Sequence, residues 1–430
     1  MAYSQRLQDH AKALGRDVRV ALVGAGQMGR GFGYQIYRMP GLTLSLVVDV
    51  DPDRIRSLFS DIGIKDVVIS TDPKVLSDAI LAGRATGTIT TEFIAELPYD
   101  IVVEATGVPD VGAQVTYSCL QAKKDVAVLN VEMDVTIGPL LHDLATRGGA
   151  VYTVCHGDEP IEAKVLVDFA RDLQFEIVAA GKGKNNPFEP LSTPDTVRER
   201  ALSRRMNPKM LCSFIDGSKT MTEMAALANA TGLELSKRGM YGPDATIKTL
   251  TDVFALQSDG GVLDRPGVVD YCMGGDVAPG VFVIVRSDAP YINHEMSYLA
   301  MGPGPYFALY RPFHLASIEA PLSIARAVLD RDPSLFAPSL MAEVCTMAKK
   351  DLNPGDRIDG IGGYTVRGYA DIAKDAKRDN LVPIGLIEGA IVQKPIKVGD
   401  LISYDQVELN ESSLIVKLRR EQDKLGLTYA

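Results

Sequence analysis

The sequence contains few cysteine residues, and none of them belongs to a recognisable pair. The chain has five cysteines in 430 residues, and no two of them show the CxxC spacing of zinc sites or dithiol redox centres. An odd number of scattered cysteines is typical of free thiols in a reducing compartment. Free thiols are therefore expected at Cys119, Cys155, Cys212, Cys272 and Cys345.

Long apolar runs and an excess of positive charge are also missing. No uninterrupted run of 18 apolar residues occurs, so no membrane-spanning helix is expected. The polar N-terminus places Leu7, Ala11 and Leu14 at helical spacing but lacks the apolar core of a signal peptide. The net charge of −10 argues against a general role on nucleic acid or on a membrane surface. We expect a cytoplasmic protein that binds any anionic substrate in a local basic pocket.

The first part of the chain alternates short β-branched runs with longer helical patterns. Apolar runs that hardly alternate indicate strands buried on both faces, and they occur at residues 18–24, 42–50, 100–107, 125–132 and 150–158. Strands alternating with helices predict an α/β fold with a doubly wound parallel sheet of the Rossmann type. We assign this domain to residues 1–155. A helical pattern at 314–330, in the segment 302–345, is expected to pack back on it and complete it.

The rest of the chain contains two regions whose sequence patterns differ from that of the first. Residues 156–301 mix helical patterns at 162–173 and 219–230 with strands at 176–182 and 280–288, which predicts an α+β domain for substrate binding and dimerisation. Residues 346–430 are rich in glycine and short strands. Within them, "LNPGDRI" at 352–358 returns as "IKVGDLI" at 396–402. Two Gly-Asp turns that enter short strands predict a small β module with pseudo-twofold symmetry.

A glycine-rich loop follows the first predicted strand. The glycines Gly24, Gly26 and Gly29 have the GxGxxG spacing of a dinucleotide-binding loop. In that loop the first glycine permits a tight turn, the second lets the pyrophosphate approach, and the third lets helix and strand pack closely. Asp49 ends the second strand 20 residues after Gly29, the usual place for the acid that binds a ribose hydroxyl and favours NAD. An ordinary turn between strand and helix is the alternative.

Other residues at the ends of predicted strands could also line the cofactor. Arg54 and Arg56 follow Asp49 and could accept a 2′-phosphate, although both fit solvated positions on a helix equally well. The predicted cofactor set also contains six loop and strand-end residues, namely Gln27, Met28, Ala105, Thr106, Gly107 and Asn130. Glu132 lies with Asn130 at the end of the fifth predicted strand.

The stretch "GKGKNNP" ends a strand of the second region with a high density of donors. Lys182 and Lys184 bring positive charge, and Asn185 and Asn186 bring amide donors. Such groups suit a phosphate or a carbonyl oxygen that gains negative charge during reduction. A solvated turn is the alternative interpretation.

A helix start at "FIDGSKTMTEM" is the second candidate. Ser218 can cap the helix, while Lys219 and Glu223 lie four residues apart on one face. This pair is either a solvated salt bridge or a lysine acid/base beside carboxylates such as Asp216 that hold a divalent cation.

Three further groups of residues need a separate interpretation. Asp158 and Glu159 leave the last Rossmann strand, where they either face the cleft or cap the next helix. His314 lies among apolar and aromatic residues and is interpreted as a core histidine. The basic residues Arg198, Arg200, Arg204, Arg205 and Lys209 are interpreted as a solvated helix face from which one or two could reach a substrate phosphate.

Several of these motifs together resemble known families. "VGAGQMGRG", "EATGV", "LNVEMD" and "MGPGP" resemble homoserine-dehydrogenase-type Rossmann proteins, in which a glycine-rich return segment lines the cofactor site. That resemblance adds Gly302 and Gly304 to the cofactor set. "HGDEP", "AAGKGKNN", "STPD", "FIDGSKTMTEMAALAN" and "RGMYGP" resemble the deoxyxylulose-phosphate reductoisomerase-like family. The tail, with "LNPGDRI" and "KPIKVGDLISYDQVEL", resembles an SAF domain, a β-clip module.

The resemblance implies an enzyme of isoprenoid biosynthesis by the methylerythritol phosphate pathway. It implies NADPH-dependent conversion of 1-deoxy-D-xylulose 5-phosphate to 2-C-methyl-D-erythritol 4-phosphate by a homodimer, with NADH as the other possible donor. Lys182 and Lys219 would stabilise an oxyanion and move protons. The metal set for Mg or Mn would be Asp158, Asp216 and Glu223, with Asp158 and Glu223 also in the catalytic set. The phosphate set would be Lys184, Asn185, Asn186, Ser218 and Arg205.

Two other functions fit the same sequence. A homoserine-dehydrogenase-like enzyme would reduce another small carbonyl or sugar-acid substrate without rearranging its carbon skeleton. A non-catalytic sensor would bind the nucleotide tightly and turn nothing over, with the SAF module as its interaction part. A shared scaffold does not decide between them, because function depends on the site.

Overall fold

The computed structural model describes residues 1–427, which divide into two compact units. The first unit consists of residues 1–158 and 315–336, and the second contains residues 159–314 and the chain from 337 onward. The five cysteines are free and buried, as the sequence predicted. None of the helices in the described part of the chain combines the length and the apolar character needed to cross a bilayer.

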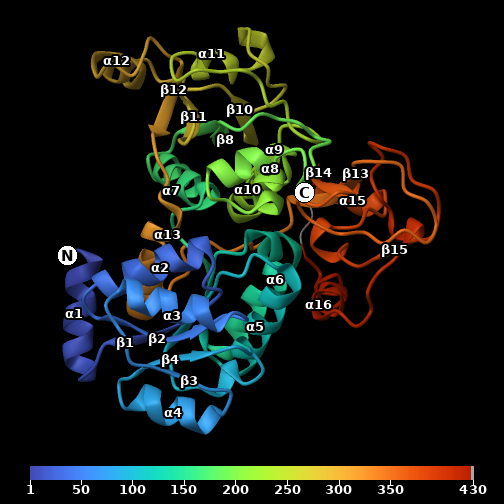
Figure 1. Ribbon diagram of the computed structural model, residues 1–430. Coiled ribbons are helices and arrows are strands. Elements are labelled where there is room, and N and C mark those ends of the chain that lie inside the picture. Colours follow the sequence, from blue (N-terminus) through green and yellow to red (C-terminus); the bar gives the residue numbers. More distant parts are fainter. Residues whose placement is uncertain (428–430) are drawn as a thin grey trace. The chain divides into compact units, whose positions relative to one another are not determined.

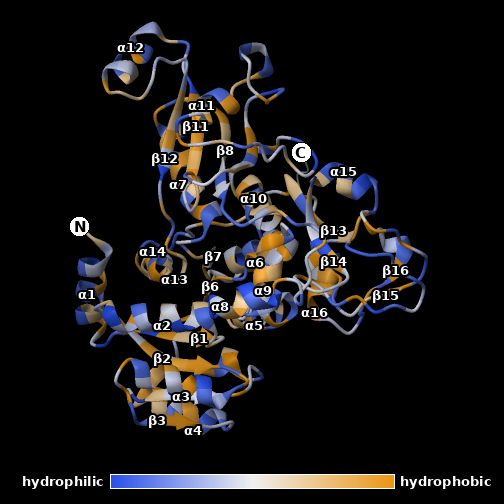
Figure 2. Cartoon of the chain, turned by 45° about the horizontal axis from the view of Figure 1, so that its top comes forward, coloured by the Kyte–Doolittle hydropathy of each residue, from blue (hydrophilic) through white to orange (hydrophobic). Residues whose placement is uncertain are grey.

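The first unit is built on a seven-stranded parallel sheet (Figure 1). Its strands lie in the order β3-β4-β2-β1-β5-β6-β7. Figure 2 shows strands β1 and β2 coloured mainly as hydrophobic, which agrees with their burial on both faces. The predicted Rossmann-type α/β fold is confirmed. The strands are β1 (Val18–Val23), β2 (Leu42–Val48), β3 (Val67–Ile69), β4 (Ala85–Thr88), β5 (Ile101–Glu104), β6 (Asp125–Val128) and β7 (Tyr152–Val154).

The order of these strands creates a switch point between β1 and β5. From β1 the chain winds outward to β2, and it later returns to the other side of β1 as β5. In open α/β sheets, ligands bind at such a point, beyond the carboxyl ends of the strands. The connecting helices are α1 (Tyr3–Leu14), α2 (Gln27–Arg38), α3 (Pro52–Asp61), α4 (Pro73–Leu81), α5 (Pro109–Gln121) and α6 (Val131–Gly148), with a 3-10 turn, η1 (Ile94–Glu96).

Residues 315–336 return to the first unit. The single helix predicted over 314–330 is two helices, α13 (Ala316–Glu319) and α14 (Pro321–Asp330), because the chain turns at Ala320 before Pro321. A proline has no backbone N–H for a continuing helix, so it starts a new helix more readily than it extends one. Ala320 and Ile324 are buried in the core of the unit, packed with residues of β1 and α2.

The second unit contains a mixed five-stranded sheet in the order β12-β11-β8-β10-β9. The central strand β8 (Glu176–Lys184) runs parallel to β10 (Val268–Met273) and antiparallel to β11 (Val281–Arg286). The outer strands are β9 (Glu234–Leu235) and β12 (Tyr306–Arg311). Helices α7 (Glu159–Asp172) and α10 (Ser218–Thr231) pack against the sheet. The shorter helices are α8 (Arg198–Ser203), α9 (Pro208–Ile215), α11 (Leu250–Val253), η2 (Gln257–Asp259) and α12 (Pro290–Tyr298).

The C-terminal part of the second unit is rich in short strands. Strands β13 (Ala342–Ala348) and β14 (Val366–Ile372) form an antiparallel pair that packs on helix α10. The two copies of the sequence echo pair with each other, because Leu352 and Ile396 exchange backbone hydrogen bonds of 2.9 and 3.0 Å. The remaining elements are α15 (Ala373–Arg378), η3 (Ile384–Leu386), β15 (Ile391–Val392), η4 (Tyr404–Gln406), β16 (Val407–Glu408) and α16 (Leu414–Gln422).

Candidate functional site

The glycine loop between β1 and α2 has the geometry of a phosphate cradle. Gly24 has a φ of +97°, and a Cβ on it would lie 2.8 Å from the carbonyl oxygen of Ala105. A Cβ on Gly29 would lie 1.9 Å from the carbonyl oxygen of Gly24. A Cβ on Gly26, in contrast, would meet nothing within 4 Å. The first and third glycines are therefore required by the fold, and the second leaves open space at the helix N-terminus, where a pyrophosphate would sit.

The two residues after Gly26 begin helix α2. Gln27 is exposed and Met28 is half-buried. Their backbone N–H groups belong to the first turn, which has no intrahelical acceptors for them. The loop and this first turn therefore fit the pyrophosphate of a dinucleotide.

Asp49 supports the glycine loop from the end of β2. Its carboxylate accepts hydrogen bonds from the backbone N–H of Ala25 at 2.8 Å and of Asp51 at 3.0 Å. The exposed Arg54 has a guanidinium nitrogen 3.9 Å from the same carboxylate. Asp49 therefore holds the backbone of the loop, which the sequence did not indicate. Its contact with a ribose hydroxyl stays a prediction.

The loop after β5 contains a buried acid. Glu104 is fully buried and accepts hydrogen bonds from the hydroxyl of Thr106 and from its backbone N–H, the latter at 2.8 Å. Burial raises the pKa of Glu104 to about 7, against the opposing effect of these hydrogen bonds. The side chain thereby fixes the loop that carries Ala105, Thr106 and Gly107, which follow β5 at the switch point.

Asn130 is a structural residue at the start of α6. It is fully buried, its side-chain oxygen accepts from the backbone N–H of Met133 at 3.1 Å, and its amide donates to the carbonyl oxygen of Val108 at 3.2 Å. It therefore caps α6 and ties it to the loop after β5. Gly302 and Gly304 lie in the second unit, before β12, with φ values of +112° and +72°. Their predicted contact with the cofactor stays a prediction.

The most concentrated charge in the second unit surrounds Lys182. Its amino group donates to Glu159 Oε1 at 2.6 Å and forms an ion pair with Glu223. The three side chains come from β8, the first turn of α7 and helix α10, and all three are buried. Burial alone would lower the pKa of Lys182, but the charges of Glu159 and Glu223 outweigh burial and raise it. Lys182 is therefore a permanently charged ammonium group rather than a base.

Lys219 and His314 extend this cluster at its edges. Lys219 Nζ lies 3.8 Å from Glu223 Oε1, and its side chain is 17% exposed. His314 Nε2 lies 3.6 Å from Glu159 Oε2, and its other ring nitrogen is 2.8 Å from the carbonyl oxygen of Pro279. The predicted pairing of Lys219 with Glu223 is present. Sequence reasoning missed the contact of His314 with Glu159, because 155 residues separate the two in the chain.

Lys184 is a buried cation with carbonyl oxygens as its partners. It donates to the carbonyl oxygen of Phe214 at 2.7 Å and to that of Pro187 at 3.3 Å. Burial, and to a smaller extent the charge of Lys182, lower its pKa to about 8. Because this pKa lies close to neutral pH, the protonation of Lys184 depends on the charges around it, and a bound anion would favour the charged form.

The other members of the predicted phosphate set are more exposed, with one exception. Asn185 is exposed, and Asn186 accepts a hydrogen bond from Arg204 at 3.4 Å. Arg205 is exposed on a left-handed backbone with φ +55°. Ser218 is buried, and its hydroxyl accepts from the backbone N–H of Gly368 at 2.8 Å. The sequence missed this link between Ser218 and strand β14.

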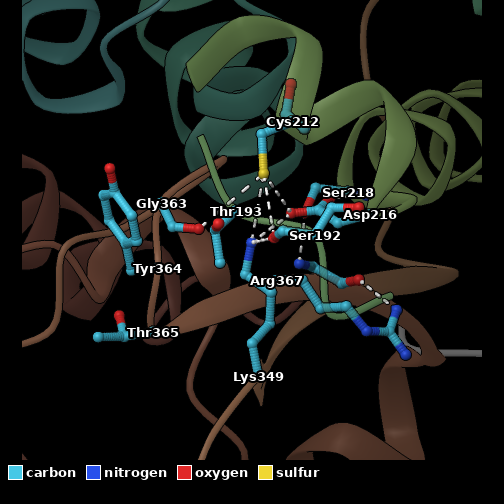
Figure 3. Close-up of polar contacts among 12 residues, drawn as sticks. Ser192, Thr193, Cys212, Asp216, Ser218, Lys349, Gly363, Tyr364, Thr365 and Arg367 are labelled. Carbon is cyan, nitrogen blue, oxygen red and sulfur yellow. Dashed lines mark hydrogen bonds and ion pairs between the residues drawn. The ribbon is translucent and has the colours of Figure 1, made fainter. Parts of the chain in front are cut away.

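Asp216 forms a buried ion pair with Lys349 (Figure 3). Lys349 Nζ lies 2.9 Å from Asp216 Oδ2, 2.7 Å from the carbonyl oxygen of Ser192 and 3.5 Å from Cys212 Sγ. The other carboxylate oxygen of Asp216 accepts from the backbone N–H of Ser218 at 2.9 Å. Nothing in the sequence connects Lys349 with Asp216, since the two are 133 residues apart.

These contacts remove Asp216 from the predicted metal set of Asp158, Asp216 and Glu223. Asp216 is held by Lys349 and does not belong to the carboxylate group around Glu223, which includes Glu159 instead. Glu159 and Glu223 already share the ammonium group of Lys182, which supplies the positive charge that a metal ion would supply. We derive no step through a metal ion.

Comparison with known families identifies two regions of the chain. Residues 157–320 match the family model described as Oxidoreductase DRL, catalytic domain. Residues 345–408 match the SAF domain. No curated protein matches the sequence. The chain is thus an oxidoreductase with a Rossmann-type first unit, a catalytic domain similar to that of the DRL oxidoreductases, and an SAF domain.

Solved structures with a similar arrangement include several dehydrogenases. A probable dehydrogenase from Thermotoga maritima is 12% identical, with 74% of this chain and 90% of that chain covered and a TM-score of 0.43. The scyllo-inositol dehydrogenase from Lactobacillus casei, solved with NAD(H) and scyllo-inositol, is 11% identical, with 74% and 91% covered and a TM-score of 0.43.

Proposed function

We propose that this protein is an NADPH-dependent reductoisomerase that converts 1-deoxy-D-xylulose 5-phosphate to 2-C-methyl-D-erythritol 4-phosphate, a step of isoprenoid biosynthesis. The observation that carries the proposal is Lys182, which is held charged between Glu159 and Glu223 inside the region similar to the DRL catalytic domain. The identity of the proposed substrate is taken from the resemblance of the sequence motifs to the deoxyxylulose-phosphate reductoisomerase-like family. A homodimer is part of the same proposal.

The lysines would provide the polar chemistry of the rearrangement. The carbon skeleton rearranges first, which needs a polarised carbonyl and proton transfer at neighbouring hydroxyl groups. Lys182 would stabilise the negative charge on the carbonyl oxygen, because its ammonium is positioned before the substrate binds and does not lose its proton. Lys219 is less buried than Lys182, and its amino group lies beside Glu223, so it would exchange protons with the substrate hydroxyls.

A nicotinamide cofactor would supply the hydride that reduces the resulting aldehyde. The cradle at Gly24, Gly26 and Gly29 fits its pyrophosphate, and Asp49 fits a ribose hydroxyl. Arg54, whose guanidinium lies 3.9 Å from Asp49, would accept a 2′-phosphate. We therefore propose NADPH as the preferred donor and NADH as the weaker one.

The decisive experiment compares carbonyl substrates with the purified full-length protein. NADPH oxidation with 1-deoxy-D-xylulose 5-phosphate should be catalytic and should yield the branched product, which NMR of the product carbons identifies. Turnover of aspartate semialdehyde in place of deoxyxylulose phosphate would replace the proposal with a homoserine-dehydrogenase-like reduction. Tight NADPH binding without turnover of either compound would indicate the sensor.

A further inference from the structure

Arg367 of strand β14 is a buried cation with an unusual set of partners. The residue is only 8% exposed. Its guanidinium donates to the carbonyl oxygen of Gly368 at 3.3 Å and contacts the sulfur of Met347 at 3.0 Å. In the described residues no carboxylate forms an ion pair with it. Burial lowers its pKa, but a guanidinium keeps its proton in a protein, so the positive charge remains and lacks an anion.

Aromatic side chains surround this guanidinium. The rings of Phe188 and Tyr369 each have their centre 5.7 Å from the Arg367 Cζ. Tyr271, on strand β10, lies within electrostatic reach of Arg367. Burial and Asp270 raise the pKa of Tyr271 to about 12, and the charge of Arg367 opposes this rise. Among residues 1–427 the hydroxyl groups of Tyr271 and Tyr369 make no hydrogen bond. Three donor groups from two strands therefore lie together, and no carboxylate in the described part of the chain accepts a hydrogen bond from them.

The nearest acid does not satisfy Arg367. Asp216 acts on the guanidinium electrostatically, but its carboxylate oxygens are bound by Lys349 and by the backbone N–H of Ser218. Figure 3 shows the Arg367 side chain directed away from the Lys349–Asp216 pair. Counting Arg367, Lys349 and Asp216 together, the group has one more positive charge than negative. A buried charge without a counter-ion is costly, which favours a bound anion at this place.

We propose that Arg367, Tyr271 and Tyr369 bind the phosphate group of the substrate, so that the SAF domain supplies a residue of the substrate site. The proposal rests on the proposed function, from which it takes the sugar phosphate. A phosphate monoester offers several acceptor oxygens and two negative charges, which match a guanidinium fork and two phenolic hydroxyls. Ser218 links the two parts of the site, because its hydroxyl accepts from the backbone N–H of Gly368, next to Arg367.

Phosphate binding is tested first on the full chain without any turnover. Thermal unfolding is followed over a series of inorganic phosphate concentrations at constant ionic strength kept with chloride, because a ligand of the folded state raises the melting temperature. We expect phosphate to stabilise the wild type, and Arg367→Gln to weaken phosphate binding at least about tenfold. Arg286→Gln is the matched control, since Arg286 on strand β11 is already paired with a carboxylate, that of Glu176 on strand β8. Equal phosphate binding by Arg367→Gln and wild type, or no phosphate effect on the wild type, overturns the proposal.

A second variant covers the case in which Arg367→Gln does not fold. The double variant Tyr271→Phe/Tyr369→Phe removes only two hydroxyl groups and keeps both rings. We expect it to fold and to bind phosphate at least about threefold more weakly than the wild type. Unchanged phosphate binding by this double variant would overturn the role of the tyrosines and, if Arg367→Gln is unfolded, the proposal.

Kinetics separate this inference from the proposed function. With 1-deoxy-D-xylulose 5-phosphate, Arg367→Gln should raise KM at least about tenfold and change kcat much less, because the phosphate is remote from the reacting carbons. The residual activity on dephosphorylated deoxyxylulose should be the same in variant and wild type. If the wild type does not turn over deoxyxylulose phosphate but binds phosphate through Arg367, the proposed function fails and the anion site stands. An unchanged KM in an active Arg367→Gln variant overturns the anion site alone.

Discussion

The amino group of Lys182 donates a 2.6 Å hydrogen bond to Glu159, and both side chains are buried. The same ammonium is ion-paired with Glu223 of helix α10, so that two carboxylates from two helices share one lysine. An ammonium held in this way is charged, oriented and dehydrated before a substrate arrives. Such preorganisation is what stabilisation of an oxyanion requires.

Replacement of Lys182 by methionine should abolish turnover and destabilise the protein. The change removes the buried ammonium that Glu159 and Glu223 share, and breaking a buried ion pair costs about 3–5 kcal/mol. Urea-induced unfolding measures the loss, which should be smaller at acidic pH, where the carboxylates take up protons. Lys164→Met is the control, because Lys164 forms an (i, i+4) pair with the more exposed Asp168 on α7. A stable, active Lys182→Met enzyme would remove Lys182 from the mechanism.

Replacement of Lys219 by alanine should abolish turnover while it leaves cofactor binding nearly intact. Lys219 makes a 3.8 Å contact with Glu223 within one helix, and Glu223 keeps the ammonium group of Lys182 as a partner when Lys219 is removed. The variant should therefore unfold at nearly the wild-type urea concentration. Turnover is measured by NADPH oxidation, and NADPH affinity by the change in cofactor fluorescence. Wild-type kcat in Lys219→Ala would show that proton transfer uses another group.

The buried Lys184 should make the stability of the protein depend on pH in the alkaline range. Its pKa falls from 10.5 to about 8 in the folded protein, chiefly through burial. Between these two values the unfolded chain binds more protons than the folded one, so folding becomes more favourable as pH rises through this window. The gain is limited to about 3 kcal/mol, because one pKa unit corresponds to about 1.4 kcal/mol.

The comparison with Lys184→Met isolates this effect from other titrating groups. Urea unfolding of both proteins near pH 7 and near pH 10 gives the difference in their free energies of unfolding. The wild type should gain stability relative to Lys184→Met as the pH rises. A difference that stays constant over this range would mean that Lys184 titrates normally.

Two glycines of the cofactor loop should respond differently to alanine. At Gly29 the added Cβ would lie 1.9 Å from the carbonyl oxygen of Gly24, whereas at Gly26 it meets nothing within 4 Å. Gly29→Ala should cost at least about 1–3 kcal/mol, because the backbone of the loop must move. Gly26→Ala should keep the wild-type melting temperature and lose NADPH affinity, because the methyl group occupies the place of the pyrophosphate. Calorimetry with and without NADPH separates the two effects, and Gly26→Ala with normal NADPH affinity would contradict the cradle.

Arg54 should determine part of the preference for NADPH over NADH. Its guanidinium lies 3.9 Å from Asp49, where it would pair with a 2′-phosphate and offset the repulsion from the carboxylate. Arg54→Gln should raise the Kd for NADPH several-fold and change that for NADH little, as titration of each cofactor would show. Arg56→Gln is the control, since Arg56 is also exposed but lies two residues further along helix α3, on a different face of it. Equal effects of Arg54→Gln on both cofactors would show that Arg54 does not discriminate between them.

The amino-acid sequence alone determined the fold of the first unit and its glycine loop. Local patterns carry that information: apolar runs that do not alternate make buried parallel strands, and the spacing of Gly24, Gly26 and Gly29 describes one continuous turn. The same locality explains the pair of Lys219 and Glu223, which is separated by one turn of helix α10.

Only the tertiary structure decided which distant residues share a charge. Lys182 meets Glu159 from α7 and Glu223 from α10, Asp216 meets Lys349 from 133 residues away, and Arg367 is left without a carboxylate. A sequence lists charged residues but does not say which of them are buried together. Burial decides their chemistry, because in a dry interior each charge must find a partner, lose its proton or bind an ion.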